Sequence, residues 1–161
     1  MEALTPDHVQ TALHALHLNI TIRFFPKSTA TSLLAAEEVG CEVGQIAKTL
    51  CFVMHDQPIL VIASGDQRVD ERKLATLLGV TRKAVTFATP DQCVEYLGYA
   101  PGSVPPVGHR QKPHAVYLDD SLKRYTHIYP AGGASNAIFR VTLAQLTYIS
   151  GGTFADVKRA P

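Results

Sequence analysis

The sequence predicts one domain of the α/β or α+β class, built around a mixed β-sheet. Its 161 residues, 46% hydrophobic and 18% charged, are enough for one globular core. Patterns typical of helices and of strands alternate along the whole chain, as in folds that pack helices onto a sheet. No repeat, low-complexity tract or linker interrupts them, so we expect residues 1–161 to form a single domain.

The N-terminal part predicts a helix, a strand and a second helix. Residues 5–7 (TPD) are typical of a helix start, because they combine a capping hydroxyl, a proline in the first turn and an acid at the positive end of the helix dipole. Residues 19–25 (NITIRFF) alternate and are rich in β-branched and aromatic side chains, which favours a strand. Residues 31–39 predict a helix that Gly40 ends.

The next segment predicts a β-hairpin. Residues 48–55 (KTLCFVMH) and 58–64 (PILVIAS) are strand-like, and Asp56-Gln57 between them is typical of a turn. Residues 59–63 are apolar at every position, which indicates a central strand that is covered on both faces.

The second half alternates helices with short strands. Asp70, Thr89 and Thr142 can each cap a helix, and the last two carry the T-x-x-Q pattern of a capping box. Gly79 and Gly98 would end the first two of these helices. The remaining strand candidates are residues 84–88, 114–119, 125–129 and 138–143.

The overall charge limits how this chain could hold nucleic acid. A net charge of +1 lacks the basic excess of a protein that grips RNA by its phosphates alone, so we expect any RNA contact to be local. The exposed basic side chains that could supply such a contact are Arg23, Arg68, Arg72, Lys73, Arg82 and Lys83.

Cysteine usage favours a reducing compartment. Cys41, Cys51 and Cys93 form no C-x-x-C pair, so neither a disulfide framework nor a cysteine zinc site is predicted. His14 and His17 share a helix face but have no third ligand nearby, so we expect no metal. No signal-peptide pattern and no stretch of the ~18 apolar residues that a membrane span needs is present, so we expect a soluble cytoplasmic protein without membrane contact.

Residues 98–109 (GYAPGSVPPVGH) form the most informative loop. Its three prolines hold φ fixed, while Gly102 and Gly108 allow positive φ and close approach of a ligand. Its main-chain N–H groups could therefore be aimed at a carbonyl or phosphate oxygen. Composition supports a rigid connector between a helix and a strand equally well.

Lys48 and Asp119 are the charged side chains that stand out in the predicted strands. Strand alternation places Lys48 on the same face as Leu50, Phe52 and Met54. A lysine on such an apolar face either reaches solvent past the end of the sheet or lies at the rim of a pocket, because an unpaired buried ammonium is costly. Asp119 ends a strand, where an acid caps a helix or binds a ligand.

Several common catalytic motifs are absent. The chain has no G-x-S-x-G elbow, H-E-x-x-H helix, P-loop or G-x-G-x-x-G fingerprint. Covalent serine hydrolysis, zinc proteolysis and nucleotide hydrolysis are therefore disfavoured.

Five segments, taken in order, resemble the YbaK/ProX family of aminoacyl-tRNA deacylases, which is similar to the editing domain inserted in bacterial prolyl-tRNA synthetases. The likeness extends from about residue 25 to residue 150, and one short motif alone would be weak. The segments are residues 44–50 (GQIAKTL), 65–79 (GDQRVDERKLATLLG), 98–109, 117–122 (YLDDSL) and 131–133 (AGG).

The resemblance implies a mixed, curved β-sheet surrounded by helices, and an enzyme that needs no cofactor and no metal. Its activity would be hydrolysis of mischarged tRNA, such as alanyl- or cysteinyl-tRNA for proline. The partners implied are the 3′ acceptor end of that tRNA and, as a second candidate, prolyl-tRNA synthetase. Residues 131–137 (AGGASNA) depart from family members that carry an acid there, which leaves the amino-acid specificity open.

The resemblance also implies the site residues. Lys48 and Gly102 correspond to the catalytic positions, Lys48 at the start of the K-T-L strand and Gly102 at the start of the G-x-x-x-P loop. The implied substrate-binding residues are Thr49, Ser103, Val104, Pro105, Pro106, Gly108, His109, Asp119 and Gly132.

An aminoacyl ester is already activated, so positioning and charge stabilisation matter more than a strong nucleophile. We hypothesise that N–H groups of residues 102–108 stabilise the oxyanion and that Lys48 contacts the terminal phosphate or ribose. The attacking group would be water or a hydroxyl or thiol of the substrate, and Asp119 would hold the loop or bind the substrate ammonium. Two alternatives stay open, namely a binding module of the same fold without hydrolysis and a hydrolase of another small ester or nucleotide.

Overall fold

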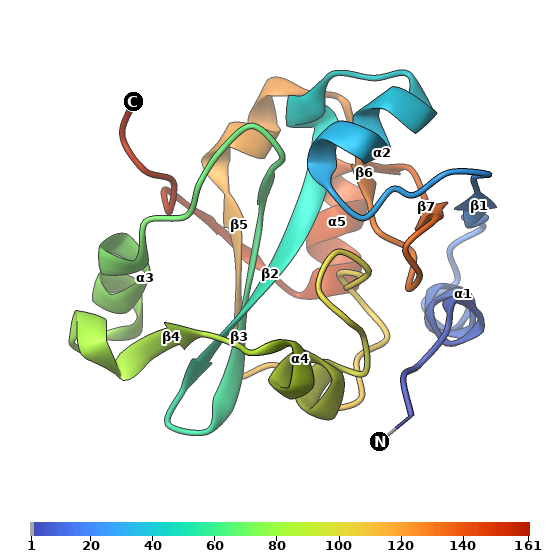
Figure 1. Ribbon diagram of the computed structural model, residues 1–161. Coiled ribbons are helices and arrows are strands. Elements are labelled where there is room, and N and C mark those ends of the chain that lie inside the picture. Colours follow the sequence, from blue (N-terminus) through green and yellow to red (C-terminus); the bar gives the residue numbers. More distant parts are fainter. Residues whose placement is uncertain (1) are drawn as a thin grey trace.

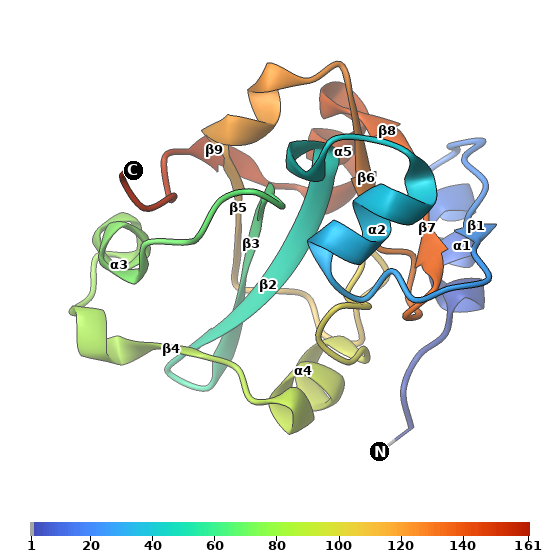
Figure 2. The same ribbon diagram turned by 45° about the horizontal axis from the view of Figure 1, so that its top comes forward.

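The computed structural model describes residues 2–161 and shows five helices around a curved, mixed β-sheet (Figure 1; Figure 2). The predicted fold class is confirmed. The helices are α1 (Pro6–Ala15), α2 (Ser32–Val39), α3 (Glu71–Leu78), α4 (Pro90–Leu97) and α5 (Leu143–Ser150), with short 3-10 turns η1 (Val43–Gln45), η2 (Arg82–Ala84) and η3 (Asp120–Arg124).

The seven-stranded sheet has the order β8-β6-β2-β3-β5-β9, and β4 also pairs with β2. The β2–β3 hairpin is antiparallel, whereas β6 runs parallel to β2 and β5 parallel to β3, so the sheet is mixed. A separate two-stranded ribbon joins β1 to β7. The strands are β1 (Arg23–Phe24), β2 (Ile46–Met54), β3 (Gln57–Ser64), β4 (Val85–Phe87), β5 (Ala115–Asp119), β6 (His127–Pro130), β7 (Ala137–Ile138), β8 (Val141–Thr142) and β9 (Thr153–Ala155).

The hairpin forms the centre of the molecule because both of its faces are covered. Ile59, Leu60, Val61 and Ile62 of β3 are fully buried, which confirms that this strand is central. Alternate residues contribute to two different cores: Ile59 and Val61 pack under α3, while Leu60 and Ile62 pack with residues of α1, α4 and α5. Complete burial of each aliphatic side chain contributes about 1.5–3 kcal/mol.

Strand β2 has a break in its pairing on the side away from β3. Along that edge, Ile46 and Ala47 pair with β6, and residues 52–54 pair with β4. The N–H of Ala88 extends this contact to the carbonyl of Cys51. Within residues 2–161 no strand pairs with residues 48–50 on this edge, so the sheet is open there.

Most predicted helix starts are confirmed by the capping bonds. The side chains of Thr31, Asp70, Thr89 and Thr142 each accept a hydrogen bond from the first turn of the helix that follows. The predicted hairpin turn is displaced by one residue: β3 begins at Gln57, and the turn consists of His55 and Asp56. Both turn residues have positive φ, which matches the twist of a two-residue hairpin.

The predicted strand at residues 19–25 is largely wrong, because only β1 pairs within it. The side-chain amide of Gln10 takes the place of a neighbouring strand. Its Nε2 donates to the carbonyl of Ile20 at 2.7 Å, and its Oε1 accepts from the N–H of Ile22 at 3.1 Å. These main-chain groups are satisfied without a sheet partner.

No helix among residues 2–161 combines the length and the apolar character that a membrane crossing requires. The same residues hold no group of three or more His, Cys, Asp or Glu side chains placed to bind a metal ion.

Candidate functional site

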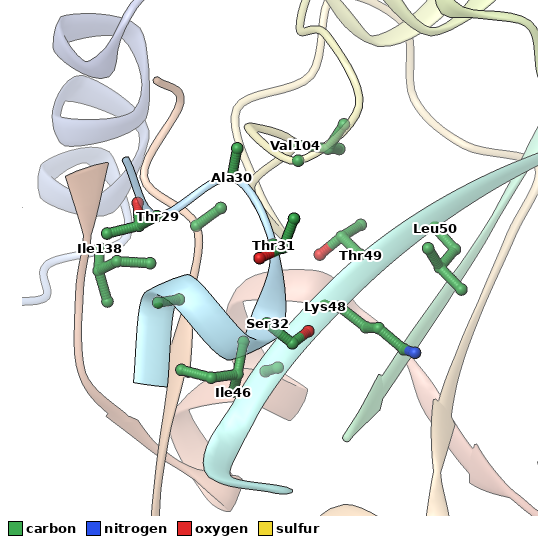
Figure 3. Close-up of a pocket in the computed structure, with 14 residues that line it drawn as sticks. Thr29, Ala30, Thr31, Ser32, Ile46, Lys48, Thr49, Leu50, Val104 and Ile138 are labelled. Atoms are coloured by element: carbon green, nitrogen blue, oxygen red, sulfur yellow. The ribbon is translucent and has the colours of Figure 1, made fainter. Parts of the chain in front are cut away.

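A cavity of about 220 Å³ lies at the break in the pairing of β2 (Figure 3). Four segments form its walls: the segment that leads into α2, the start of β2, the loop at Gly102, and the region of β6 and β7. The lining residues are Thr29, Ala30, Thr31, Ser32, Ala35, Ile46, Ala47, Lys48, Thr49, Leu50, Gly102, Val104, Ala131 and Ile138. Lys48 and Gly102, which lie far apart in the sequence, therefore line one cavity.

Thr49 brings both main-chain and side-chain polar groups to this cavity. The carbonyl of Cys51 points to the edge of β2 away from β3, where it accepts from Ala88. Every second residue of an antiparallel strand directs its N–H and C=O groups to the same edge. Thr49, two residues earlier, directs its main-chain groups to that open edge as well. A ligand in the cavity would meet this N–H and C=O pair.

The Thr49 hydroxyl has no partner in the described part of the chain. The residue is 8% exposed, and its Oγ1 is buried without a hydrogen bond. Figure 3 shows the hydroxyl directed toward Thr31 across the cavity. A buried polar group left unbonded costs about 1–3 kcal/mol, so a ligand that bonded it would recover that free energy.

The N-terminus of α2 forms the opposite wall. Thr31 caps the helix by accepting from the N–H of Leu34 at 3.2 Å, and Ser32 and Ala35 of the first turn line the cavity. Among residues 2–161, the N–H groups of Ser32 and Leu33 find no acceptor. The helix dipole places partial positive charge at this end, which favours an anionic or carbonyl oxygen.

Gly102 lies in direct contact with the segment before α2. Its φ is +86°, and a Cβ at this position would lie 2.5 Å from the carbonyl oxygen of Ala30. The loop is also held from behind, since the N–H of Gly133 donates to the carbonyl of Ser103 at 3.1 Å. The N–H groups of Gly102 and Val104 have no acceptor among the described residues. Of the two interpretations of this loop, the shaped loop that a ligand approaches closely is the one that fits, because Gly102 and Val104 line the cavity.

Lys48 lines the cavity, but its ammonium points elsewhere. The side chain is half-buried on the face of β2 opposite Thr49, and Figure 3 shows it extending away from Thr31 and Val104. The ammonium donates to the carbonyl of Gln67. Burial lowers the pKa of Lys48 below its ordinary value of 10.5, Asp66 opposes this shift, and Arg68 adds to it. Among residues 2–161 this is the one hydrogen bond of the ammonium, so two of its three N–H groups are left for a ligand.

The other loop residues predicted from the resemblance shape the cavity from outside its lining. His109 bonds the carbonyl of Pro105 at 2.7 Å, and burial lowers its pKa. The hydroxyl of Tyr99 donates to the carbonyl of Gly108 at 2.7 Å. Ser103, Pro105, Pro106 and Gly132 are buried and, like Gly108 and His109, do not line the cavity.

Asp119 lies in the protein interior rather than at this cavity. It is 0% exposed, and its two carboxylate oxygens accept from the N–H groups of Ser121 and Val157, both at 2.9 Å. It therefore caps η3 and fixes the C-terminal segment. Of the two roles considered for this strand-end acid, the structure places it in the capping one.

Residues at the start of α2 and before it contribute to the cavity and were not predicted as site residues from the sequence. Thr29, Ala30 and Ser32 line it beside Thr31, which was predicted only as a helix start. The one sequence feature that could have indicated them is the run of small and hydroxyl side chains at residues 28–32 (STATS). Because their place opposite β2 depends on tertiary packing, local patterns do not reveal it.

The fold and the site together define the class: an α/β domain with a small, partly polar cavity at a break in a mixed sheet, walled by main-chain groups and small side chains. Comparison with known proteins identifies the family to which this domain belongs. The chain belongs to the aminoacyl-tRNA editing domain family, whose model matches residues 26–149. The family predicted from the sequence is confirmed.

Individual relatives agree with this membership. The chain is 36% identical over 127 residues to the uncharacterised protein YwhH of Bacillus subtilis, covering 78% of each chain. It is 36% identical over 72 residues to the proline–tRNA ligase of Lactiplantibacillus plantarum, which is 45% of this chain but 12% of the ligase. A crystal structure described as a candidate trans-editing enzyme for prolyl-tRNA synthetase matches with a TM-score of 0.89 and 38% identity, covering 96% of this chain and 97% of that one.

Proposed function

We propose that this protein hydrolyses the ester bond of mischarged aminoacyl-tRNA, with small amino acids such as alanine or cysteine on proline tRNA as substrates. The observation that carries the proposal is that Lys48 of β2 and Gly102 of the loop line the same small cavity. The ligase and trans-editing relatives support the tRNA class. Prolyl-tRNA synthetase is the partner that those relatives suggest.

In this proposal the aminoacyl group enters the break in β2. The Thr49 carbonyl accepts from the substrate ammonium, and the Thr49 hydroxyl bonds the ester. The N–H groups of Gly102 and Val104, together with the positive end of α2, stabilise the oxyanion that develops on the ester carbonyl. Lys48 uses a free ammonium N–H to hold the terminal phosphate or ribose at the rim.

The reaction needs no covalent intermediate with the protein. Water, or a hydroxyl or thiol of the substrate, attacks the carbonyl carbon, and the bond from that carbon to the ribose oxygen breaks. With water, the ribose oxygen leaves as a hydroxyl carrying one of the water protons, and the amino acid is released as a carboxylate after losing the other to solvent. Rate acceleration then rests on fixed geometry and preorganised dipoles.

Selection would depend on the size of the cavity. A volume of about 220 Å³ bounded by Ile46 and Ile138 leaves room for a short side chain. Each methylene is worth only about 1–3 kcal/mol of discrimination, so we expect graded preferences rather than absolute ones.

The direct test supplies the purified chain with a panel of mischarged tRNAs and measures release of free amino acid. We expect turnover with at least one small amino acid and a strong loss in Lys48→Ala and Gly102→Ala, while Lys112→Ala, an exposed charge change outside the cavity, stays at the wild-type rate. Full activity in both cavity variants would refute the site. Binding of tRNA without any turnover would instead establish the non-catalytic binding module. The lining residues include no cysteine nucleophile, which is compatible with that alternative as well.

A further inference from the structure

A second hollow, which we call the arginine groove, lies beside the cavity. Its volume is about 540 Å³, and residues from β1, β6, β8, α5, the segment before β1 and the connection between β7 and β8 form it. Polar and basic side chains dominate the lining, with no aspartate or glutamate among them. The lining residues are Asn19, Ile20, Thr21, Arg23, His127, Tyr129, Arg140, Thr142 and Gln145.

The two guanidinium groups of the groove keep their positive charge available. Within residues 2–161 neither Arg23 nor Arg140 forms a salt bridge, and both are exposed. Arg23 lies over the ring of Phe25, with 5.1 Å from Cζ to the ring centroid, which restrains it without neutralising it. The positive end of α5 adjoins Thr142 and adds partial charge of the same sign.

Another basic hollow, beside α3, differs in this respect. It includes Asp70 and Glu71 among its lining residues, and Arg82 there is paired with Glu71. Nearby, Lys73 is paired with Asp156 at 3.1 Å. These ion pairs reduce the free positive charge around α3, so the arginine groove is the stronger candidate for binding an anion.

The arginine groove and the cavity share the same pairs of strands. Tyr129 of the groove lies beside Ile46 of the cavity in the β2–β6 pair, and Arg23 of the groove faces Ile138 of the cavity in the β1–β7 pair. The β1–β7 pair is antiparallel, and directly opposed residues of such a pair have Cβ atoms about 4.5–5.5 Å apart. The two hollows therefore adjoin along these strand pairs.

We infer that the arginine groove binds a phosphodiester of the tRNA acceptor strand while the aminoacylated end of that strand occupies the cavity. This inference rests on the proposed function and adds the surface that holds the RNA. Guanidinium groups match phosphate oxygens in a two-pronged geometry, and the flat rings of His127 and Tyr129 suit stacking on a base. Of the basic residues that the sequence offered as RNA contacts, Arg23 is the one this inference retains, with Arg140 added.

The test compares two double variants of the full chain. Arg23→Ala/Arg140→Ala removes the groove cations, and Lys112→Ala/Arg159→Ala removes two exposed cations outside the groove and the cavity. Binding of uncharged tRNA is measured over a range of salt concentrations. We expect the groove variant to bind at least about tenfold more weakly and the slope of log Kd against log salt to fall by about 1.4–1.8, as for two lost phosphate contacts. The control variant should match the wild type.

A minimal substrate separates this inference from the proposed function. An aminoacyl ester of adenosine carries no phosphodiester and needs only the cavity, so the groove variant should hydrolyse it at the wild-type rate. If the wild type hydrolyses neither this ester nor mischarged tRNA, yet RNA binding depends on the groove, hydrolysis is refuted and the groove stands. Unchanged affinity and salt slope in the groove variant would overturn the inference. The inference would also be overturned if the groove variant lost binding to polyglutamate or inorganic phosphate but bound RNA like the wild type.

Discussion

The carbonyl oxygen of Ala30 lies 2.5 Å from the position that a Cβ on Gly102 would occupy, so the loop and the segment before α2 meet with no room for a side chain. This contact sets the distance between two walls of the cavity. Gly102 also has a φ of +86°, a conformation that alanine adopts only with strain.

Gly102→Ala should therefore impair the protein in two separable ways. Gly40→Ala is the matched control, because Gly40 has a φ of +80° but nothing within 4 Å of its Cβ position. We expect Gly40→Ala to lower the free energy of unfolding by about 1 kcal/mol, and Gly102→Ala to lower it by at least about 1 kcal/mol more. Urea unfolding measures both, and equal losses would show that the Ala30 contact is readily relieved. Deacylation should fall only in Gly102→Ala.

Thr49→Val tests the buried hydroxyl. Valine keeps the shape of the side chain and removes an Oγ1 that has no partner in the described chain. We expect the free energy of unfolding to stay the same or to rise by about 1 kcal/mol, while deacylation falls by about tenfold or more. Thr49→Ser restores a hydroxyl and should recover much of the rate. A Thr49→Val protein with the wild-type rate would remove the hydroxyl from the mechanism.

Lys48→Met tests the charge of the half-buried lysine through pH. Burial lowers the pKa of Lys48 in the folded protein below 10.5, so between that lowered pKa and 10.5 the unfolded chain binds more protons than the folded one. Wild-type stability relative to Lys48→Met should therefore rise as the pH increases toward 10.5 from below. Unfolding of both proteins across alkaline pH measures this difference. A constant difference would mean that the lysine has an ordinary pKa.

Asp119→Ala should damage stability rather than substrate binding. The variant leaves the N–H groups of Ser121 and Val157 without their acceptors in the protein interior, which we expect to cost about 2–4 kcal/mol. Thermal unfolding measures the loss. At a temperature where the variant is still folded, KM for mischarged tRNA should be unchanged, and a raised KM with intact stability would return Asp119 to the substrate-binding residues.

Features set by local hydrogen bonds were predictable from the sequence. The caps at Thr31, Asp70 and Thr89 follow from side chains that bond their own helix, and the central strand β3 follows from its unbroken apolar run. The strand predicted at residues 19–25 failed because Gln10, distant in the sequence, satisfies the main chain there.

The site was predictable only in part, and for the same reason. Resemblance to a known family pointed to Lys48 and Gly102, which do line one cavity. No local pattern indicates that Lys48 bonds Gln67 or that the start of α2 closes the opposite wall, since both depend on how distant segments pack. Arg140 of the groove was missed because an isolated exposed arginine carries no signal of its own.

The short interruption along β2 also affects how the protein behaves at high concentration. An exposed sheet edge invites a strand of another molecule to add to it, a common origin of aggregation. Here β6 and β4 flank an opening of only residues 48–50, which is at the lower limit of strand length. The free main-chain groups of this segment can thus bind a small ligand, but the segment is too short for a strand of another molecule to pair with it.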